Sequence, residues 1–114
     1  MDLVSVHTAP LEPLYQVRPG RGLTAAVEGA GMEILYATRA VELIVEKGAV
    51  RGVVAREGSD TFDIRARAVV LASGGFEANT EWRTRYLGPG WDLRPVRGTR
   101  FNTGDGIRMA LDIG

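Results

Sequence analysis

A short run that is apolar at every position, Ala68–Ala72, constrains the fold more than any other feature of the sequence. A strand with no polar side suits a sheet that is covered on both faces, as parallel sheets flanked by helices are. The run ends in Ser73, Gly74 and Gly75, where the small side chains let the main chain turn sharply and approach a ligand. It predicts a buried parallel strand, and its end is either a tight exit or a nucleotide contact.

Segments rich in β-branched and aromatic residues precede this strand and are separated by turn-like breaks at 47–49 and 58–60. We therefore expect the three middle strands to form an antiparallel meander, with Val41, Leu43 and Val45 on one face. The expected strands are 33–38, 41–46, 50–57, 61–65 and 68–72.

Helices are expected around this sheet, and the first 22 residues are expected to be irregular because several prolines interrupt them. Asn79 is a candidate N-cap for the second helix, in which Trp82 and Tyr86 share a face that favours packing in the core. The expected helices are 23–30, which ends at Gly31, then 80–86 and 104–113.

A second glycine-rich motif, Asn102-Thr103-Gly104-Asp105-Gly106, leads into the last of these helices. The first amides of a helix have no partner within it, so they attract polar ligand atoms. Thr103 or Asp105 as a simple helix cap is an equally good interpretation.

Composition excludes several classes of function. Fourteen basic and fourteen acidic side chains give a net charge of zero, which argues against a nucleic-acid partner. The absence of cysteine, with a single histidine, argues against a metal site and fits a cytoplasmic protein. No apolar stretch approaches the roughly 20 residues of a membrane span. Arg94, Arg97 and Arg100 are interpreted as solvated surface charges.

The two glycine-rich motifs, in this order, resemble the FAD-binding portion of the fumarate reductase and succinate dehydrogenase flavoprotein family. The resemblance covers about residues 20–114, and residues 86–104 are most similar to the tricarballylate dehydrogenases of that family. It implies an α/β fold, or α+β for this chain in isolation: part of an FAD-binding Rossmann-type domain with an inserted antiparallel meander. Residues 1–22 would be a lead-in and residues 23–114 a partial FAD-binding domain.

The resemblance also implies which residues contact FAD. The backbone of Ala40 and Val41 would meet the adenine, and Ala72, Ser73 and Gly74 would line the ADP portion. The flavin side would be approached by Asn102, Thr103, Gly104 and Asp105. The G-x-G-x-x-G motif with which the family grips the pyrophosphate is absent from the chain.

We expect the chain to be part of an FAD-dependent oxidoreductase that dehydrogenates a small, tricarballylate-like carboxylate by hydride transfer to the flavin, with an unidentified electron acceptor. Because the family's substrate-binding groups are expected beyond residue 114, we assign no catalytic residue and expect the chain alone to be inactive. A ketosteroid or other alkene-forming flavin dehydrogenase is the alternative within the same superfamily. A self-associating, non-catalytic module with exposed strand edges is an alternative of a different class.

Overall fold

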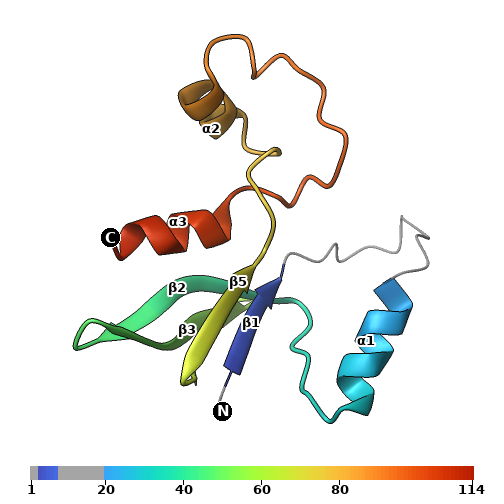
Figure 1. Ribbon diagram of the computed structural model, residues 1–114, viewed down its shortest axis with the longest axis vertical. Coiled ribbons are helices and arrows are strands. Elements are labelled where there is room, and N and C mark those ends of the chain that lie inside the picture. The colour runs from blue at the N-terminus through green and yellow to red at the C-terminus, as the bar shows by residue number, and fades with distance from the viewer. Residues whose placement is uncertain (1–2, 8–19) are drawn as a thin grey trace.

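The computed structural model describes residues 3–7 and 20–114, which form two sheets and several helices (Figure 1). A parallel pair of strands lies beside a three-stranded antiparallel meander, and a C-terminal helix lies above both. In chain order the elements are β1 (Leu3–His7), α1 (Gly20–Gly29), β2 (Thr38–Glu46), β3 (Ala49–Glu57), β4 (Asp60–Arg65), β5 (Ala68–Ala72), α2 (Thr80–Trp82), the π-helix η1 (Arg83–Leu87) and α3 (Asp105–Asp112).

The meander has the strand order β2-β3-β4, as the turn-like breaks predict. Lys47 and Gly48 both have positive φ, at 52° and 76°, which is the backbone of a tight hairpin turn that matches the twist of the strands. The predicted common face of Val41, Leu43 and Val45 is wrong in part: Leu43 is buried, whereas Val45 is 43% exposed. The pairing of β2 with β3 shifts register after Ala40 and again after Ile44, and each shift interrupts the alternation of faces.

Part of the predicted irregular lead-in is a strand. Residues Leu3–His7 form β1, which pairs in parallel with β5 from Leu3 opposite Ala68 to His7 opposite Ala72. The prolines that suggested irregular structure all follow this strand, and they lie outside the described residues. The long-range pairing with β5 provides the hydrogen bonds that a five-residue strand requires.

The core lies where β1, β5 and the meander meet under α3. Leu43, Val53 and Met109 are buried there, and partly buried apolar side chains surround them: Val6, Ala40, Val50, Ile64, Val69 and Leu71. Met109 is 1% exposed, so α3 is held on the sheets by a fully buried side chain. β5 does not meet the expectation of cover on both faces, because Val69 and Leu71 face the core while Val70 is 46% exposed among the residues described.

The helices begin and end largely where capping signals predict. After α1 the amides of Gly31 and Met32 donate to the carbonyls of Glu28 and Val27, at 2.9 and 3.2 Å, which is the Schellman arrangement. The Asn79 side chain accepts from the amide of Trp82 at 3.0 Å and caps α2. The helix predicted at 80–86 is α-helical only to Trp82, and the next residues, Arg83–Leu87, form the wider π-helix η1.

The predicted strand at 33–38 is wrong. This segment is irregular up to a turn at Tyr36 and Ala37, and only Thr38 belongs to a strand. Local polar contacts fix the turn instead: the Thr38 hydroxyl donates to the Tyr36 carbonyl at 2.9 Å, and the Tyr36 hydroxyl donates to Glu28 at 3.2 Å. Ala37, with φ of 53°, has a left-handed backbone that no regular strand accommodates.

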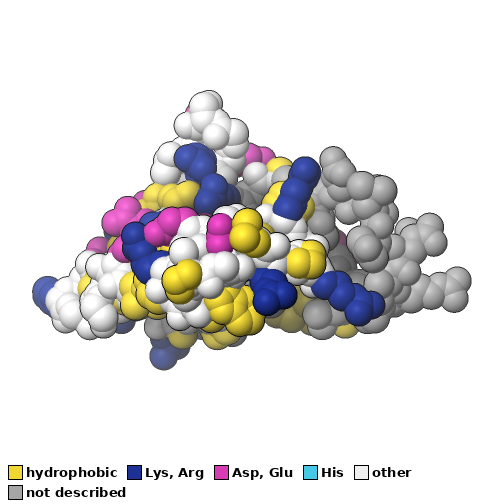
Figure 2. All heavy atoms as spheres, turned by 90° about the horizontal axis from the view of Figure 1, so that it is seen from above, with side chains coloured by type: hydrophobic (Ala, Val, Ile, Leu, Met, Phe, Trp, Pro, Cys, Tyr) yellow, Lys and Arg dark blue, Asp and Glu magenta, His cyan; other side chains and the backbone are white. Residues whose placement is uncertain are grey.

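Charge and apolar surface are dispersed over the face that Figure 2 shows, where acidic and basic side chains lie interspersed. This distribution agrees with the net charge of zero. In the described ranges, no helix has both the length and the apolar character needed to cross a membrane. Residues 3–7 and 20–114 also contain no group of three or more acidic or histidine side chains arranged to hold a metal ion.

Candidate functional site

The two glycine-rich motifs form bends that lie against each other, although they are far apart in the sequence: the first bend is residues 73–75 and the second bend is residues 102–106. A Cβ placed on Gly106 would lie 2.2 Å from the Ser73 hydroxyl, and one on Gly74 would lie 3.0 Å from the Asn102 side chain. At both positions a side chain would displace its neighbour, and Gly74 also has φ of 76°, a conformation that favours glycine. The small residues therefore serve to bring the end of β5 and the start of α3 together.

Hydrogen bonds hold the two bends in register. The Ala78 amide donates to the Asn102 carbonyl at 2.9 Å, and the Asn79 side-chain amide donates to the Thr103 carbonyl at 3.0 Å. The side-chain amide of Asn102 donates to Glu77. Asn79 thus has two roles, since its oxygen caps α2 while its nitrogen holds the second bend.

An aromatic cluster of Phe76, Trp82 from α2 and Tyr86 from η1 packs against the second bend. The rings of Phe76, Trp82 and Tyr86 meet edge to face, with centroids 5.5–5.9 Å apart. Gly104 is buried against this cluster with φ of 87°, and a Cβ there would lie 2.6 Å from the Trp82 ring. The prediction that Trp82 and Tyr86 pack in the core is wrong: the rings pack on one another, but Trp82 is half-buried, Tyr86 is 54% exposed, and neither belongs to the core under α3.

The start of α3 differs from the prediction that Thr103 or Asp105 caps it. The N-cap residue is Gly104, which has no side chain, and Asp105 is the first residue of the helix. The Asp105 carboxylate instead accepts from the Thr103 hydroxyl at 3.2 Å and from the Arg39 guanidinium, whose Nη2 lies 2.6 Å from Oδ2. These contacts connect the second bend to the start of β2.

The three groups of candidate residues are therefore brought together around the first turn of α3. Ala40 and Val41 are half-buried on β2, beside Arg39. Ala72 is exposed at the end of β5, Ser73 is buried, and Gly74 is exposed. Asn102, Thr103 and Asp105 are half-buried, and Gly104 is buried.

This arrangement fits part of a dinucleotide site. Ala72 and Gly74 are exposed, Gly74 necessarily through its main chain, and the first amides of α3 have no acceptor within the helix. Both features suit ribose hydroxyls and the polar edge of a flavin rather than an apolar ligand. The sequence contains no G-x-G-x-x-G motif of the kind that binds a pyrophosphate, so these residues fit the two ends of FAD better than its centre.

Residues 6–114 match the family described as FAD binding domain. The chain belongs to that family. FAD is therefore the cofactor of the fold, as the resemblance implied, and the α/β architecture with an antiparallel meander is confirmed.

Two curated relatives are 3-oxosteroid 1-dehydrogenases. The protein of Mycolicibacterium smegmatis is 37% identical over 105 residues, which cover 83% of this chain and 18% of the relative. That of Mycobacterium tuberculosis is 36% identical over 98 residues, covering 81% of this chain and 17% of the relative. A urocanate reductase of Eggerthella lenta is 40% identical over 58 residues, covering 48% of this chain and 10% of the relative. The chain thus spans less than a fifth of the length of these relatives.

Solved structures agree with the sequence relatives. The 3-ketosteroid Δ1-dehydrogenase of Sterolibacterium denitrificans, in complex with 1,4-androstadiene-3,17-dione, superimposes with a TM-score of 0.73 at 36% identity, over 81% of this chain and 17% of that one. The 3-ketosteroid Δ4-(5α)-dehydrogenase of Rhodococcus jostii RHA1, in complex with 4-androstene-3,17-dione, gives 0.72 at 31% identity, over 81% and 19%. These similarities support the ketosteroid alternative, and they do not support the resemblance to tricarballylate dehydrogenases.

Sequence reasoning missed three arginines that organise the site. Arg39 and Arg108 connect β2 to α3, through Asp105 and through the Val41 carbonyl at 3.0 Å. Arg83 is buried and donates to the carbonyls of Arg94 and Asp92, at 2.7 and 3.3 Å, which holds the loop between η1 and the second bend. Their partners are distant in sequence or are backbone carbonyls, so no local pattern identifies them.

The ionised form of the Glu77 carboxylate is favoured by its hydrogen bonds. Its pKa is lowered, first by the hydrogen bond from the Asn102 side chain and then by a backbone hydrogen bond. A lowered pKa means that the ionised form stabilises the fold above the unfolded-state pKa, and that this contribution is lost as the pH falls through the folded-state value.

We expect Glu77→Gln to remove this dependence. The variant should lose about 1 kcal/mol of stability at neutral pH, because an amide accepts the Asn102 hydrogen bond less strongly. The difference in the free energy of unfolding between the variant and the unchanged protein should then disappear in acid. Urea unfolding across neutral to acidic pH measures both, and a constant difference at every pH would contradict this role.

Proposed function

We propose that this chain forms the part of an FAD-dependent dehydrogenase that holds the adenosine and flavin-side portions of the cofactor, in an enzyme that introduces a carbon–carbon double bond into a 3-ketosteroid. The observation that carries the proposal is the contact between the bends at 73–75 and 102–106, which a single FAD molecule must bridge. Contact of FAD with Ala40, Val41, Ala72, Ser73, Gly74, Asn102, Thr103, Gly104 and Asp105 is part of this proposal.

The chemistry divides between cofactor and protein. In such a dehydrogenation, two adjacent carbons of the substrate each lose a hydrogen and a double bond forms between them. One hydrogen leaves as a proton to a base, and the other leaves with its electron pair as a hydride, which FAD accepts. The residues of this chain would bind and orient the cofactor, and we assign no proton-transferring residue to them.

The choice of a steroid follows the relatives rather than the cofactor bends, because bends that contact FAD through main chain do not encode the substrate. Two 3-oxosteroid dehydrogenases and two ketosteroid dehydrogenase structures match more than four-fifths of the chain. A carboxylate substrate is the second candidate, because the urocanate reductase of Eggerthella lenta is 40% identical over the 58 residues that it matches. We further propose a cytoplasmic location and a separate electron acceptor.

Anaerobic reduction of the bound flavin tests this function. The complete protein is expected to purify yellow with FAD, and 4-androstene-3,17-dione is expected to bleach the flavin absorbance because hydride passes to FAD. Tricarballylate, which can be dehydrogenated, and urocanate, which already carries a double bond and can only reoxidise reduced flavin, serve as carboxylate comparisons. Bleaching by tricarballylate, or reoxidation of dithionite-reduced flavin by urocanate, without bleaching by the steroid would replace the first candidate with the second. A protein that binds no FAD when supplied with it would refute both.

Self-association of the isolated chain through exposed strand edges is a separate expectation. Size-exclusion chromatography with light scattering of the 114-residue chain tests it, and a monomer at all concentrations would contradict it.

A further inference from the structure

The first turn of α3 is connected to β2 at two points. Asp105 pairs with Arg39, and Arg108 donates to the carbonyl of Val41. Asp105 and Arg108 lie three apart on α3, about one turn, and therefore on one face of the helix. Their partners on β2, Arg39 and Val41, flank Ala40 in the sequence, so the two contacts join one short stretch of β2 to one face of α3.

The first contact is a two-pronged ion pair. Arg39 Nε and Nη2 both donate to Asp105 Oδ2, at 3.0 and 2.6 Å. The Asp105 side chain is 29% exposed and is also bonded to the Thr103 hydroxyl, so it is better ordered than an isolated surface carboxylate. Arg39 thereby fixes the start of β2 relative to the second bend.

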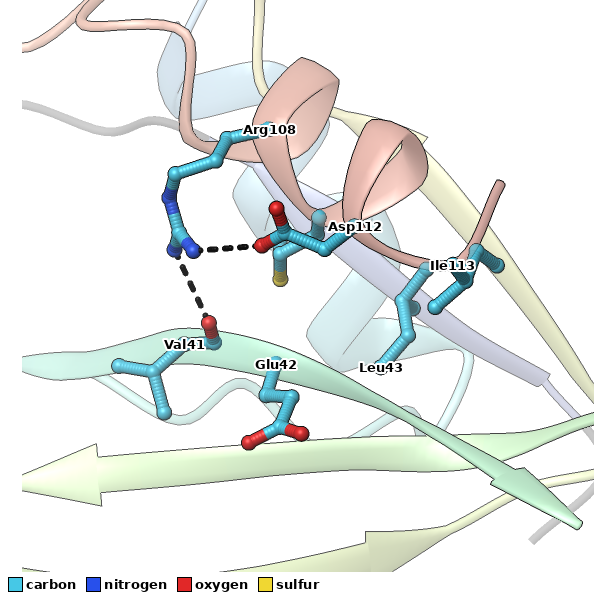
Figure 3. A pocket seen from close by; sticks show the side chains of 7 residues that line it. Val41, Glu42, Leu43, Arg108, Asp112 and Ile113 are labelled. Atoms are coloured by element: carbon cyan, nitrogen blue, oxygen red, sulfur yellow. Dashed lines mark hydrogen bonds and ion pairs between the residues drawn. The ribbon is translucent and has the colours of Figure 1, made fainter.

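The second contact uses an irregularity of the sheet. Ala40 pairs with Ala55 and Glu42 pairs with Val54, so Val41 is an extra residue without a partner position on β3. Its carbonyl accepts from Arg108 Nη2 at 3.0 Å instead of belonging to the ladder. Figure 3 shows this carbonyl directed at Arg108, and the Glu42 side chain directed away from it.

Arg108 is itself held in place. Its Nη1 lies 2.9 Å from Asp112 Oδ2, one turn further along α3. The two contacts orient the guanidinium between strand and helix at the edge of the hollow that Figure 3 shows, which Leu43, Met109 and Ile113 also line. Met109, on the same helix, is fully buried, so Arg108 is attached to a rigid part of the fold.

We propose that Arg39 and Arg108 are positioning residues that set the separation between the adenine end and the flavin end of the FAD site. This inference rests on the proposed function, because Ala40 and Val41 belong to the proposed adenine contact and residues 102–105 to the flavin side. Preorganising both ends favours a ligand that spans them, because less freedom is lost when it binds. A ligand that occupies one end gains little from the same contacts.

The test compares FAD with ADP, using the complete protein stripped of cofactor. Arg39→Gln is expected to weaken FAD binding about threefold to fivefold, as for a partly exposed ion pair. The Arg39→Gln/Arg108→Gln double variant is expected to weaken it about tenfold or more. ADP, titrated as a competitor of FAD, should keep its affinity to within about twofold in both variants, because it does not need the two ends in register.

Arg65→Gln is the matched control. Arg65 also connects the meander through a carboxylate on β2, Glu46, and its side chain is 55% exposed, as that of Arg39 is. Its removal should leave the affinities for FAD and ADP unchanged. Arg39→Lys should keep most of the FAD affinity, since one ammonium group satisfies the single oxygen that Arg39 contacts.

The outcomes separate the inference from the function on which it rests. Equal loss of FAD and ADP affinity in the arginine variants, or no loss of either, would overturn the positioning role while FAD binding by the unchanged protein stands. An unchanged protein that does not bind FAD at all would overturn the proposed function together with the inference.

Discussion

Replacing Gly104 with alanine is expected to destabilise the complete protein by about 2–4 kcal/mol and to release bound FAD. Gly104 has φ of 87°, and a Cβ there would lie 2.6 and 2.8 Å from two ring carbons of Trp82 and 3.0 Å from the Phe76 Cβ. The ring is held by edge-to-face contacts with Phe76 and Tyr86, so it does not swing away freely. Denaturant unfolding, with the flavin absorbance that remains after gel filtration, measures both effects.

Gly90→Ala separates the two causes of the stability loss in Gly104→Ala, which are backbone strain and the clash with the Trp82 ring. Gly90 has φ of 86°, almost the same as Gly104, but a Cβ there meets nothing within 4 Å. Its replacement should therefore cost only the backbone strain of about 1–2 kcal/mol and should leave FAD bound. If Gly90→Ala destabilised the protein as much as Gly104→Ala, the Trp82 ring would have no part in the effect.

A double-mutant cycle with Trp82→Leu tests the contact itself. Trp82→Leu removes the ring that the new methyl group would strike, so Gly104→Ala should cost less in that background than in the unchanged protein. Additive losses would show that the methyl group and the ring do not meet. The cycle also reports whether the aromatic cluster transmits its effect to the second bend.

The local features of this fold were predictable from sequence. The hairpin turns at 47–48 and 58–59, the cap at Asn79 and the strand Ala68–Ala72 each depend on residues within a few positions of one another. For the same reason both bends were identified, because their glycines and small side chains are adjacent in sequence. Their contact with each other followed only from the family resemblance, and the structure provides it through Asn102 and Ser73.

Features that depend on distant partners were not predictable. β1 exists because β5 lies beside it, and the following prolines concealed its alternating pattern. The extra residue at Val41 is visible only in the pairing with β3, and it is this irregularity that frees a carbonyl for Arg108. The net charge likewise does not indicate which arginines have specific partners, as Arg39, Arg83 and Arg108 do.

Gly52→Ala is expected to have the largest effect on stability, about 3–5 kcal/mol. A Cβ on Gly52 would lie 2.1 Å from the Ile64 carbonyl oxygen and 3.0 Å from the Arg65 Cα. Both are backbone atoms of β4, which pairs directly with β3 at this position, so no side-chain rotation relieves the clash. The Gly52 φ of 146° adds strain for any residue with a side chain. Urea unfolding of the complete protein without cofactor measures the loss.

Gly48→Ala is the control within the same meander, because Gly48 also has positive φ but open space around it. It should cost about 1–2 kcal/mol of stability, and an equal loss for Gly48→Ala and Gly52→Ala would contradict the clash with β4.

The two variants with large effects, Gly52→Ala and Gly104→Ala, should differ in how FAD affects their stability. The clash at Gly52 pushes β4 away on the side of β3 opposite β2, whereas the clash at Gly104 moves the second bend itself. Saturating FAD should therefore restore much of the stability of Gly52→Ala and little of that of Gly104→Ala, since a ligand stabilises only a fold that still binds it.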